Sequence, residues 1–247
     1  METNHTKLIY LEDMAKLVHE ARVESVLEEE GKTIVILNET IFYPQGGGQP
    51  YDQGTITSGT TVFKVEEVRF IEGVVRHIGR FEQGSFVNGD TVSLAVDPAR
   101  RALHARLHSG GHVVDMAVQK LSLSWNPGKG YHFSDGPYVE YDGVLDEGEE
   151  AKEKVRANIE AVANEFIEEG IKTSIKFMPK SEMYTVCLHV PDYLPEDKPA
   201  RVVLYGTFGV PCGGTHVANL KDIGHLSVRK VSVKKGVIRV GYDVERS

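Results

Sequence analysis

Two short clusters of metal-binding residue types lie about a hundred positions apart in the chain. His108 and His112 are four residues apart in the segment HSGGH, and Cys212 and His216 have the same spacing in CGGTH. Histidines at positions i and i+4 of a helix lie on one face, where both imidazoles can reach one ion. A thiolate and an imidazole on a glycine-rich turn form a second half-site, and such N/S ligands are typical of zinc. The spacing therefore predicts one zinc ion per chain.

Comparison with known classes of zinc site excludes two classes but does not decide between a structural and a catalytic site. A metalloprotease of the HExxH type requires Glu directly after the first histidine, where this chain has Ser109. The two pairs also lie too far apart for a zinc finger. Four protein ligands favour a closed structural site, but replacement of one ligand by water would open it for catalysis. Both interpretations stay open at the level of sequence.

A third motif is the glycine run within YPQGGGQPYDQG, which starts at Tyr43. Three consecutive glycines, Gly46 to Gly48, can present backbone N–H groups to an anion or a small polar ligand. The run is not a P-loop, because no Lys-Ser or Lys-Thr pair follows it. Taken alone, a plain turn is the simpler interpretation.

The elements that must position these motifs differ between the two parts of the chain. Residues 20–96 contain short β-rich runs separated by Gly, Asn and Asp, which is typical of a small β-barrel. Asp97 and Pro98 then predict the start of a helix that carries HSGGH. We therefore expect an α+β chain, with a β-barrel domain over residues 1–96 that carries the GGGQ loop and an α+β zinc-binding domain over 97–247.

A second helix is predicted from about residue 149 to 169, with Gly170 as its stop. We expect four apolar side chains to face inward from it: Val155, Ile159, Val162 and Phe166. The strands predicted after it include a terminal hairpin that turns at residues 234–236. Strands and helices do not alternate regularly, which favours an α+β domain over a parallel α/β sheet.

Composition excludes several classes of protein. The chain has 247 residues, of which 40% are hydrophobic and 26% charged, so it is neither disordered nor collagen-like. It has no run of about 18 apolar residues, so we expect no membrane span. Two cysteines cannot form a disulfide framework, and no signal peptide is visible. We therefore expect a cytoplasmic protein.

Charge is distributed unevenly along the chain. The formal net charge is −8, but residues 98–134 carry five Lys or Arg and one acid, and residues 201–247 carry eight and three. Residues 135–200 carry sixteen acids and seven bases. Local fields rather than the total charge steer a polyanion, so the basic segments are compatible with a nucleic-acid partner. Solvated faces of mixed sign are the alternative.

The order of the motifs FYPQGGGQPYDQG, HSGGH, GKGYHFSDGPYVEY and PCGGTH resembles the AlaX family of free-standing alanyl-tRNA editing proteins, in its medium-length form. The resemblance covers residues 7–244 and extends to the editing domain of alanyl-tRNA synthetase. It implies a hydrolase that deacylates misacylated tRNA(Ala), with Ser-tRNA(Ala) as substrate and Gly-tRNA(Ala) as a second candidate. It assigns the zinc ion to four ligands: His108, His112, Cys212 and His216.

The resemblance also implies the residues around the substrate. We expect catalytic roles for His108, His112, Gln49 and Ser109. We expect the aminoacyl pocket to be lined by Gly46, Gly47, Gly48, Gln49, Lys129 and Gly130. Two positions depart from the synthetases, which commonly have Thr where this chain has Gly111 and Gln where it has Gly128. The contact to the serine hydroxyl is therefore expected to move to Ser109, Gln49 or the backbone.

Basic side chains are the expected contacts to tRNA phosphates, which position a substrate without reading sequence. They lie on the zinc helix and the terminal hairpin: Arg100, Arg101, Arg106, Arg229, Lys230, Lys234 and Lys235. The alternative is that the hairpin lysines only solvate a turn. We expect no DNA or membrane partner, and the sequence does not predict an oligomeric state.

Two other functions stay open. The chain could be a zinc-stabilised tRNA-binding module without catalysis. It could also edit another misacylated tRNA, because the editing domain of threonyl-tRNA synthetase has similar zinc motifs, although the GGGQ-containing barrel favours the alanyl branch. Hydrolysis of an activated ester needs little more than a positioned water, so zinc could either bind that water or orient the substrate.

Overall fold

The computed structural model describes residues 5–146 and 148–245. The chain divides into two compact units, one formed by residues 1–46 and 50–103 and the other by residues 47–49 and 104–247. The predicted α+β class, with a small β-barrel in the N-terminal part, is confirmed. The domain boundaries 1–96 and 97–247 stay a prediction. Residues 47–49 of the glycine loop group with the second unit.

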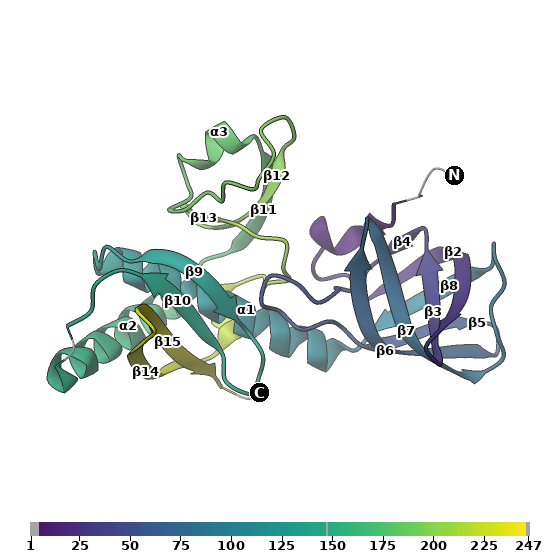
Figure 1. Ribbon diagram of the computed structural model, residues 1–247, viewed down its shortest axis with the longest axis horizontal. Helices are drawn as coiled ribbons and strands as arrows, with labels where there is room; N and C mark the ends of the chain where they lie inside the picture. The colour runs from purple at the N-terminus through teal and green to yellow at the C-terminus, as the bar shows by residue number, and fades with distance from the viewer. Residues whose placement is uncertain (1–4, 147, 246–247) are drawn as a thin grey trace. The chain divides into compact units, whose positions relative to one another are not determined.

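A closed antiparallel barrel forms most of the first unit (Figure 1). Its strands pair in the order β2-β3-β7-β6-β5-β8, and β8 pairs with β2 to close it. The barrel strands are β2 (Val18–Glu29), β3 (Lys32–Leu37), β5 (Gly54–Ser58), β6 (Thr61–Ile71), β7 (Val74–Gln83) and β8 (Thr91–Val96). Outside the barrel, β1 (Lys7–Leu8) pairs in parallel with β4 (Glu39–Thr40), and a short 3-10 helix, η1, spans Ile9–Leu11.

Local sequence explains the hairpins of the barrel. Glu30-Gly31 joins β2 to β3 and Glu72-Gly73 joins β6 to β7, and all four residues have positive φ. Two-residue turns of this kind match the right-handed twist of the flanking strands and favour glycine. Apolar side chains then alternate into the barrel interior, where Val35, Phe63 and Leu94 are fully buried.

The first turn of helix α1 (Pro98–Lys120) is also explained by local sequence. The Asp97 carboxylate accepts hydrogen bonds from the backbone N–H of Ala99 and Arg100, as an N-cap does. Arg101 is buried, and its guanidinium donates to the Asp52 carboxylate at 2.6 Å and to backbone carbonyls. Arg101 is therefore engaged in an internal ion pair and is not exposed to meet a phosphate.

A four-stranded antiparallel sheet and two helices form the core of the second unit (Figure 1). The strands lie in the order β14-β15-β10-β9, with bounds Leu226–Lys234, Val237–Val244, Tyr138–Asp142 and Asn126–Tyr131. Lys235 and Gly236 both have positive φ at the β14–β15 turn, where the sequence predicts it. A short 3-10 helix, η2 (Leu220–Ile223), precedes β14. Among the described residues, no helix has the length and apolarity that a membrane crossing requires.

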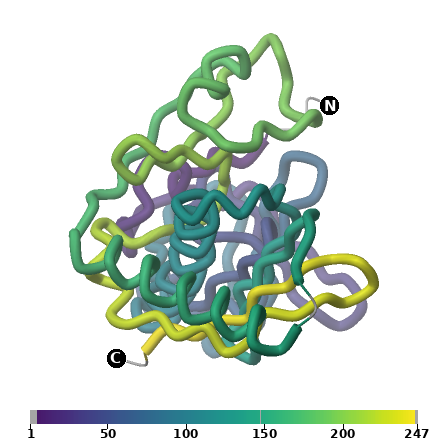
Figure 2. The backbone as a smooth tube through the Cα atoms, turned by 90° about the vertical axis from the view of Figure 1, so that its left-hand side faces the viewer, coloured from purple at the N-terminus to yellow at the C-terminus, as the bar shows by residue number. Residues whose placement is uncertain are grey.

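Helix α2 (Glu149–Glu169) lies along β14, as the tube view shows (Figure 2). Glu160 accepts from the backbone N–H of Val228, and Asn164 bonds both backbone groups of Leu226. Gly170 ends the helix in the left-handed conformation, as predicted. The inward face differs from the prediction in part: the buried residues are Ile159, Ala163 and Ile167, while Val155, Val162 and Phe166 are only half-buried. The buried residues of α2 are those set by its contact with β14, and they form a stripe displaced from the one predicted from the larger apolar side chains.

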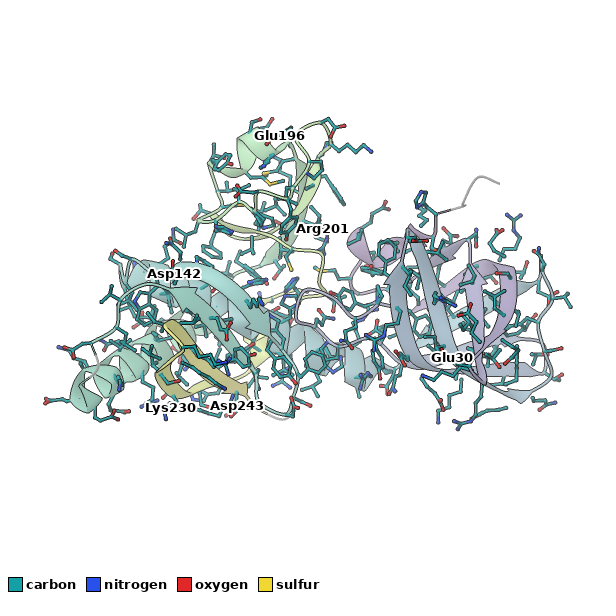
Figure 3. All side chains as sticks on the ribbon, viewed as in Figure 1. Glu30, Asp142, Glu196, Arg201, Lys230 and Asp243 are labelled. Carbon is teal, nitrogen blue, oxygen red and sulfur yellow. The ribbon has the colours of Figure 1, made fainter. Side chains whose placement is uncertain are left out.

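A small three-stranded sheet completes the second unit. It pairs β11 (Thr173–Met178), β12 (Ala200–Tyr205) and β13 (Phe208–Pro211), and a one-turn helix, α3 (Lys180–Met183), precedes its long connection. A separate apolar cluster that includes Met178, Met183 and Cys187 holds this part together. Glu196, labelled in Figure 3, forms an ion pair with Lys180 at 2.8 Å. The chain leaves β13 directly into the CGGTH segment, so this sheet positions the second pair of predicted ligands.

Candidate metal centre

The two distant sequence clusters meet in the second unit. Helix α1 presents His108 and His112, and the turn after β13 presents Cys212 and His216, with ligand atoms all within 4.8 Å of one another. The Cys212 Sγ lies 3.5 Å from His108 Nε2 and 3.4 Å from His216 Nε2. Tetrahedral zinc, with bonds of roughly 2.0–2.3 Å, places its ligand atoms about 3.3–3.7 Å apart. This cluster could therefore bind a metal ion.

The environment of the cluster fits a cation of this kind. His112 Nε2 is buried and has no hydrogen-bond partner within the described ranges. A buried nitrogen left without a partner is costly unless a proton donor or an ion satisfies it. Three imidazoles and one thiolate are a donor set that zinc prefers. Zinc as the identity of the ion stays a proposal.

Each histidine of the cluster is held through its second ring nitrogen. His108 Nδ1 lies 2.8 Å from Gln49 Oε1, and His112 Nδ1 lies 3.2 Å from Asp115 Oδ2. His216 Nδ1 lies 3.0 Å from the Tyr205 hydroxyl. Partners of this kind fix the tautomer and the orientation of a ligating imidazole. The Nε2 atoms of the three rings are thereby directed toward the cluster.

The Gln49 side chain is hydrogen-bonded within the protein, whereas the sequence predicts that it contacts the substrate. Its side chain is fully buried, and its Oε1 also accepts from the backbone N–H of Thr215 at 3.0 Å. Its Nε2 donates to Thr215 Oγ1 at 2.8 Å. Gln49 therefore connects the glycine loop to the CGGTH turn and orients His108, so we regard it as a positioning residue.

Ser109 is likewise committed inside the protein. It is fully buried, and its hydroxyl accepts from the backbone N–H of Val217 at 3.1 Å and lies 3.3 Å from His216 Nδ1. A hydroxyl held in this way supports His216. The structure gives Ser109 a supporting contact to His216, and its expected catalytic role stays a prediction.

The sequence motifs do not single out Asp115 as a residue of the site. It stands three residues after His112 on α1, so the i, i+3 spacing is the signal that could have identified it. Its other oxygen accepts from the Tyr141 hydroxyl at 2.6 Å. The carboxylate is thus held on both sides between His112 and the sheet.

Burial controls the protonation of the cluster. Burial and the neighbouring imidazoles hold the pKa of His108 and His216 well below the usual range, so both rings are neutral, as metal ligands must be. Burial also acts to lower the pKa of His112, but the hydrogen bond to Asp115 and the nearby Cys212 thiol raise that pKa to about 9. An ion would have to displace this proton, so metal affinity falls at acidic pH.

A cavity of about 540 Å³ opens beside the cluster. Its lining includes the metal-ligand candidates His108, His112 and Cys212, together with Gly47, Gly48, Lys129 and Gly130 from the predicted pocket. Gly46 belongs to the first unit, where its carbonyl accepts from the Tyr43 hydroxyl. The glycine loop therefore contributes to the second unit mainly through residues 47–49.

His132 is a further cavity residue that the motif analysis missed. Its ring stacks on His108 with centroids 4.4 Å apart, and its Nδ1 lies 2.7 Å from the Tyr242 hydroxyl. Burial, with a smaller effect of His112, lowers the pKa of His132 to about 3, so the ring is neutral. Its position two residues after Gly130 in GKGYHF is the sequence signal that could have drawn attention to it.

Comparisons with known proteins cover almost the whole chain. A family model described as tRNA synthetases class II (A) matches residues 2–100. The alanine–tRNA ligase of Methanobrevibacter smithii is 32% identical over 96% of this chain, and that of Methanothrix thermoacetophila is 34% identical over 84%. These matches support an AlaX-like alanyl-tRNA editing domain. The chain spans about a quarter of the length of these ligases, with 27% and 23% of each covered.

The basic residues of the chain differ in their exposure. Arg106 is buried, and its guanidinium donates to the Ile223 carbonyl at 2.8 and 3.1 Å, so like Arg101 it has a structural role. Arg100 donates to the Tyr51 carbonyl and lies over that ring. Exposed cations remain on the cavity rim and the terminal hairpin: Lys129, Arg229, Lys230, Lys234 and Lys235. Figure 3 labels Lys230 on β14 and Asp243 on β15 of that hairpin, and Asp243 forms an ion pair with Arg229 at 3.0 Å.

We predict that Gln49→Leu lowers zinc affinity by about 10- to 100-fold, the usual cost of losing the partner of a ligating histidine. The substitution removes the acceptor for His108 Nδ1 while nearly preserving side-chain volume. Affinity is measured by competition with a chromophoric chelator. Gln45→Leu, at an exposed position of the same segment, is the matched control and should bind zinc as the parent does. Equal affinity of both variants would contradict the positioning role.

Proposed function

We propose that this chain is a hydrolase that deacylates Ser-tRNA(Ala), with Gly-tRNA(Ala) as a second candidate substrate, at a zinc-containing site. The likeness to alanine–tRNA ligases supports an editing or binding role related to alanine tRNA. The observation that carries the finer proposal is that the metal cluster and the glycine loop line one cavity. We place the reaction in the cytoplasm, where aminoacyl-tRNAs are used.

The physical need for such a hydrolase follows from the chemistry of serine. A synthetic pocket shaped for the alanine methyl group cannot strongly reject an amino acid that only adds a hydroxyl. A second site that hydrogen-bonds this hydroxyl can reject alanine, because its buried polar group would then stay unpaired. The cavity should therefore be polar near the aminoacyl group, and His108, His112 and His132, which line it, are polar groups that support this expectation.

Different residues of the chain would hold the metal ion, approach the ester and bind the tRNA end. A bound zinc ion would supply a Lewis-acid charge at its four ligands. Gly47 and Gly48 line the cavity, and glycine backbone there can approach the aminoacyl ester closely. Lys129 is exposed at the cavity and supplies positive charge for the phosphodiester of the tRNA end.

Neither of the carboxylates that line the cavity is free to act as a general base. Asp115 is held by His112 and Tyr141, and Glu140 forms an ion pair with Arg239 at 2.5 Å. This supports attack by a water that the site positions, assisted by the ribose hydroxyl of the substrate.

Serine release tests the proposal directly. Purified zinc-loaded protein is incubated with tRNA(Ala) charged with serine, glycine or alanine, and the remaining ester is measured over time. We expect rapid loss of the seryl ester, with the alanyl ester largely preserved. Binding of tRNA without any cleavage would instead identify a zinc-stabilised tRNA-binding module, and cleavage confined to another misacylated tRNA would reassign the substrate.

We also propose that exposed lysines of the β14–β15 hairpin contact tRNA phosphates, and predict that Lys234→Glu/Lys235→Glu raises the KM for Ser-tRNA(Ala). The variant should also flatten the salt dependence of binding, because fewer counterions are released. Lys172→Glu/Lys176→Glu, which makes the same charge change at exposed positions of the acidic segment, is the matched control. If both variants bind and deacylate as the parent does at every salt concentration, tRNA docks elsewhere.

A further inference from the structure

Three glycines leave room for the imidazole of His132 beside the metal cluster. A Cβ atom on Gly111 would lie 2.5 Å from His132 Cε1, and one on Gly130 would lie 2.4 Å from Nε2. A Cβ atom on Gly48 would lie 3.2 Å from Cδ2. These glycines come from α1, β9 and the glycine loop, which are separate in sequence. The position of the ring therefore depends on a cradle that any other residue would fill.

Hydrogen bonding determines which nitrogen of His132 carries the proton. The Tyr242 hydroxyl lies 2.7 Å from the Leu107 carbonyl, which can only accept, so the hydroxyl donates its one proton there. It must then accept from His132 Nδ1, also 2.7 Å away. Burial disfavours a charged ring, so with the proton on Nδ1 the other nitrogen, Nε2, carries a lone pair, and no protein hydrogen bond to Nε2 is found among the described residues.

The unpaired Nε2 belongs to the edge of the ring that faces the cavity. Gly48 and Gly130, which contact that edge, both line the cavity, as does His132 itself. His132 as a residue is only 3% exposed, yet its Nε2 is not among the fully buried partnerless atoms of the described residues, so a ligand in the cavity can reach and cover this nitrogen. A ligand that enters the cavity and offers no donor to Nε2 would leave a buried polar atom unsatisfied, at a cost in binding.

We propose that His132 Nε2 accepts a hydrogen bond from the side-chain hydroxyl of the aminoacyl group and so selects serine. This inference rests on the proposed deacylation and names the group that sets its specificity. The other two side chains expected to contact the serine hydroxyl already have partners inside the protein. Gln49 is hydrogen-bonded to His108 and Thr215. The Ser109 hydroxyl contacts Val217 and His216. His132 is a neutral acceptor with nothing to donate from Nε2, which matches a hydroxyl donor and penalises the methyl group of alanine.

The test compares seryl and glycyl substrates, because glycine shares the ester and the ammonium group but has no hydroxyl. His132→Leu removes the acceptor, His132→Gln restores one near the position of Nε2, and His225→Leu is a control at an exposed histidine. We expect His132→Leu to lower kcat/KM for Ser-tRNA(Ala) by roughly 100-fold and to change that for Gly-tRNA(Ala) by less than about threefold. His132→Gln should recover most of the serine activity.

Binding separates this inference from the proposed hydrolysis. Amide-linked seryl, glycyl and alanyl adenosines cannot be cleaved, so their affinities are measured by calorimetry whether or not the protein is a deacylase. A parent that prefers the seryl compound and loses the preference in His132→Leu supports the inference even if no ester is cleaved. A parent without serine preference overturns it even if esters are cleaved.

Two further outcomes are decisive. If the seryl and glycyl substrates lose activity together in a His132→Leu protein that retains its metal, His132 acts on the ammonium group or the water, and the inference fails. If His132→Leu does not fold, Tyr242→Phe takes its place, since this change keeps the ring but releases its fixed tautomer. It should reduce the preference for serine over glycine, and an unchanged preference would refute the role of His132.

Discussion

Cys212→Ala and His112→Ala are each expected to lose most of the bound zinc and to reduce deacylation of Ser-tRNA(Ala) by more than about 100-fold. Each change leaves three ligands at a buried site, and loss of even an indirect partner of a zinc ligand costs about 10- to 100-fold. Metal content by mass spectrometry and kcat/KM for the seryl ester are the two measurements. Zinc and activity should fall together.

Cys187→Ala is the matched control for the cysteine substitution. Cys187 is buried in the apolar cluster of the small sheet, and it is not among the ligands of the candidate metal centre. The variant should keep a full complement of zinc and the activity of the parent. Full zinc occupancy in both Cys212→Ala and His112→Ala would show that the four residues do not form the metal site.

Gly48→Ala is expected to reduce deacylation by about 100-fold while leaving zinc bound. Gly48 has a φ of +77°, and an added Cβ would lie 2.2 Å from the Gly130 carbonyl oxygen. Because this contact is between two backbone segments, no side chain can move to relieve it, and the loop must shift at the cavity. The measurements are zinc content and kcat/KM for Ser-tRNA(Ala).

Gly59→Ala separates the effect of backbone strain from the effect of the contact. Gly59 also has a positive φ, +56°, but a Cβ there would meet nothing within 4 Å. It should cost some stability and leave deacylation unchanged. If Gly48→Ala turns over the seryl ester at the rate of the parent, the glycine loop is a plain turn, the interpretation that its sequence alone favours.

Local sequence was sufficient for most of the secondary structure. Asp97 and Pro98 mark the start of α1, Gly170 marks the end of α2, and Lys235-Gly236 marks the last hairpin, because caps and tight turns are determined by a few adjacent residues. The buried face of α2 was predicted less well. The orientation of α2 is set by its contacts with β14, more than fifty residues further along the chain. Helical spacing alone does not predict which strand the helix packs against.

The sequence by itself also determined the composition of the metal cluster. Two pairs with the same i, i+4 spacing restrict the choice to His108, His112, Cys212 and His216, and the structure brings these four residues together. Their number and chemistry could be read without the fold, since each pair is a local feature of a helix or a turn.

Only the tertiary structure decided what surrounds these ligands. Gln49 and His108 are 59 residues apart, and His132 and Tyr242 are 110 apart, yet each pair shares a hydrogen bond of 2.7–2.8 Å. It also showed that Arg101 and Arg106 are buried, although their sequence context suggests an exposed basic face. A side-chain hydrogen bond depends on positions to a fraction of an ångström, and those positions result from packing between distant segments. No local pattern encodes such contacts, so the residue proposed to select serine, His132, and the positioning role of Gln49 emerged only from the fold.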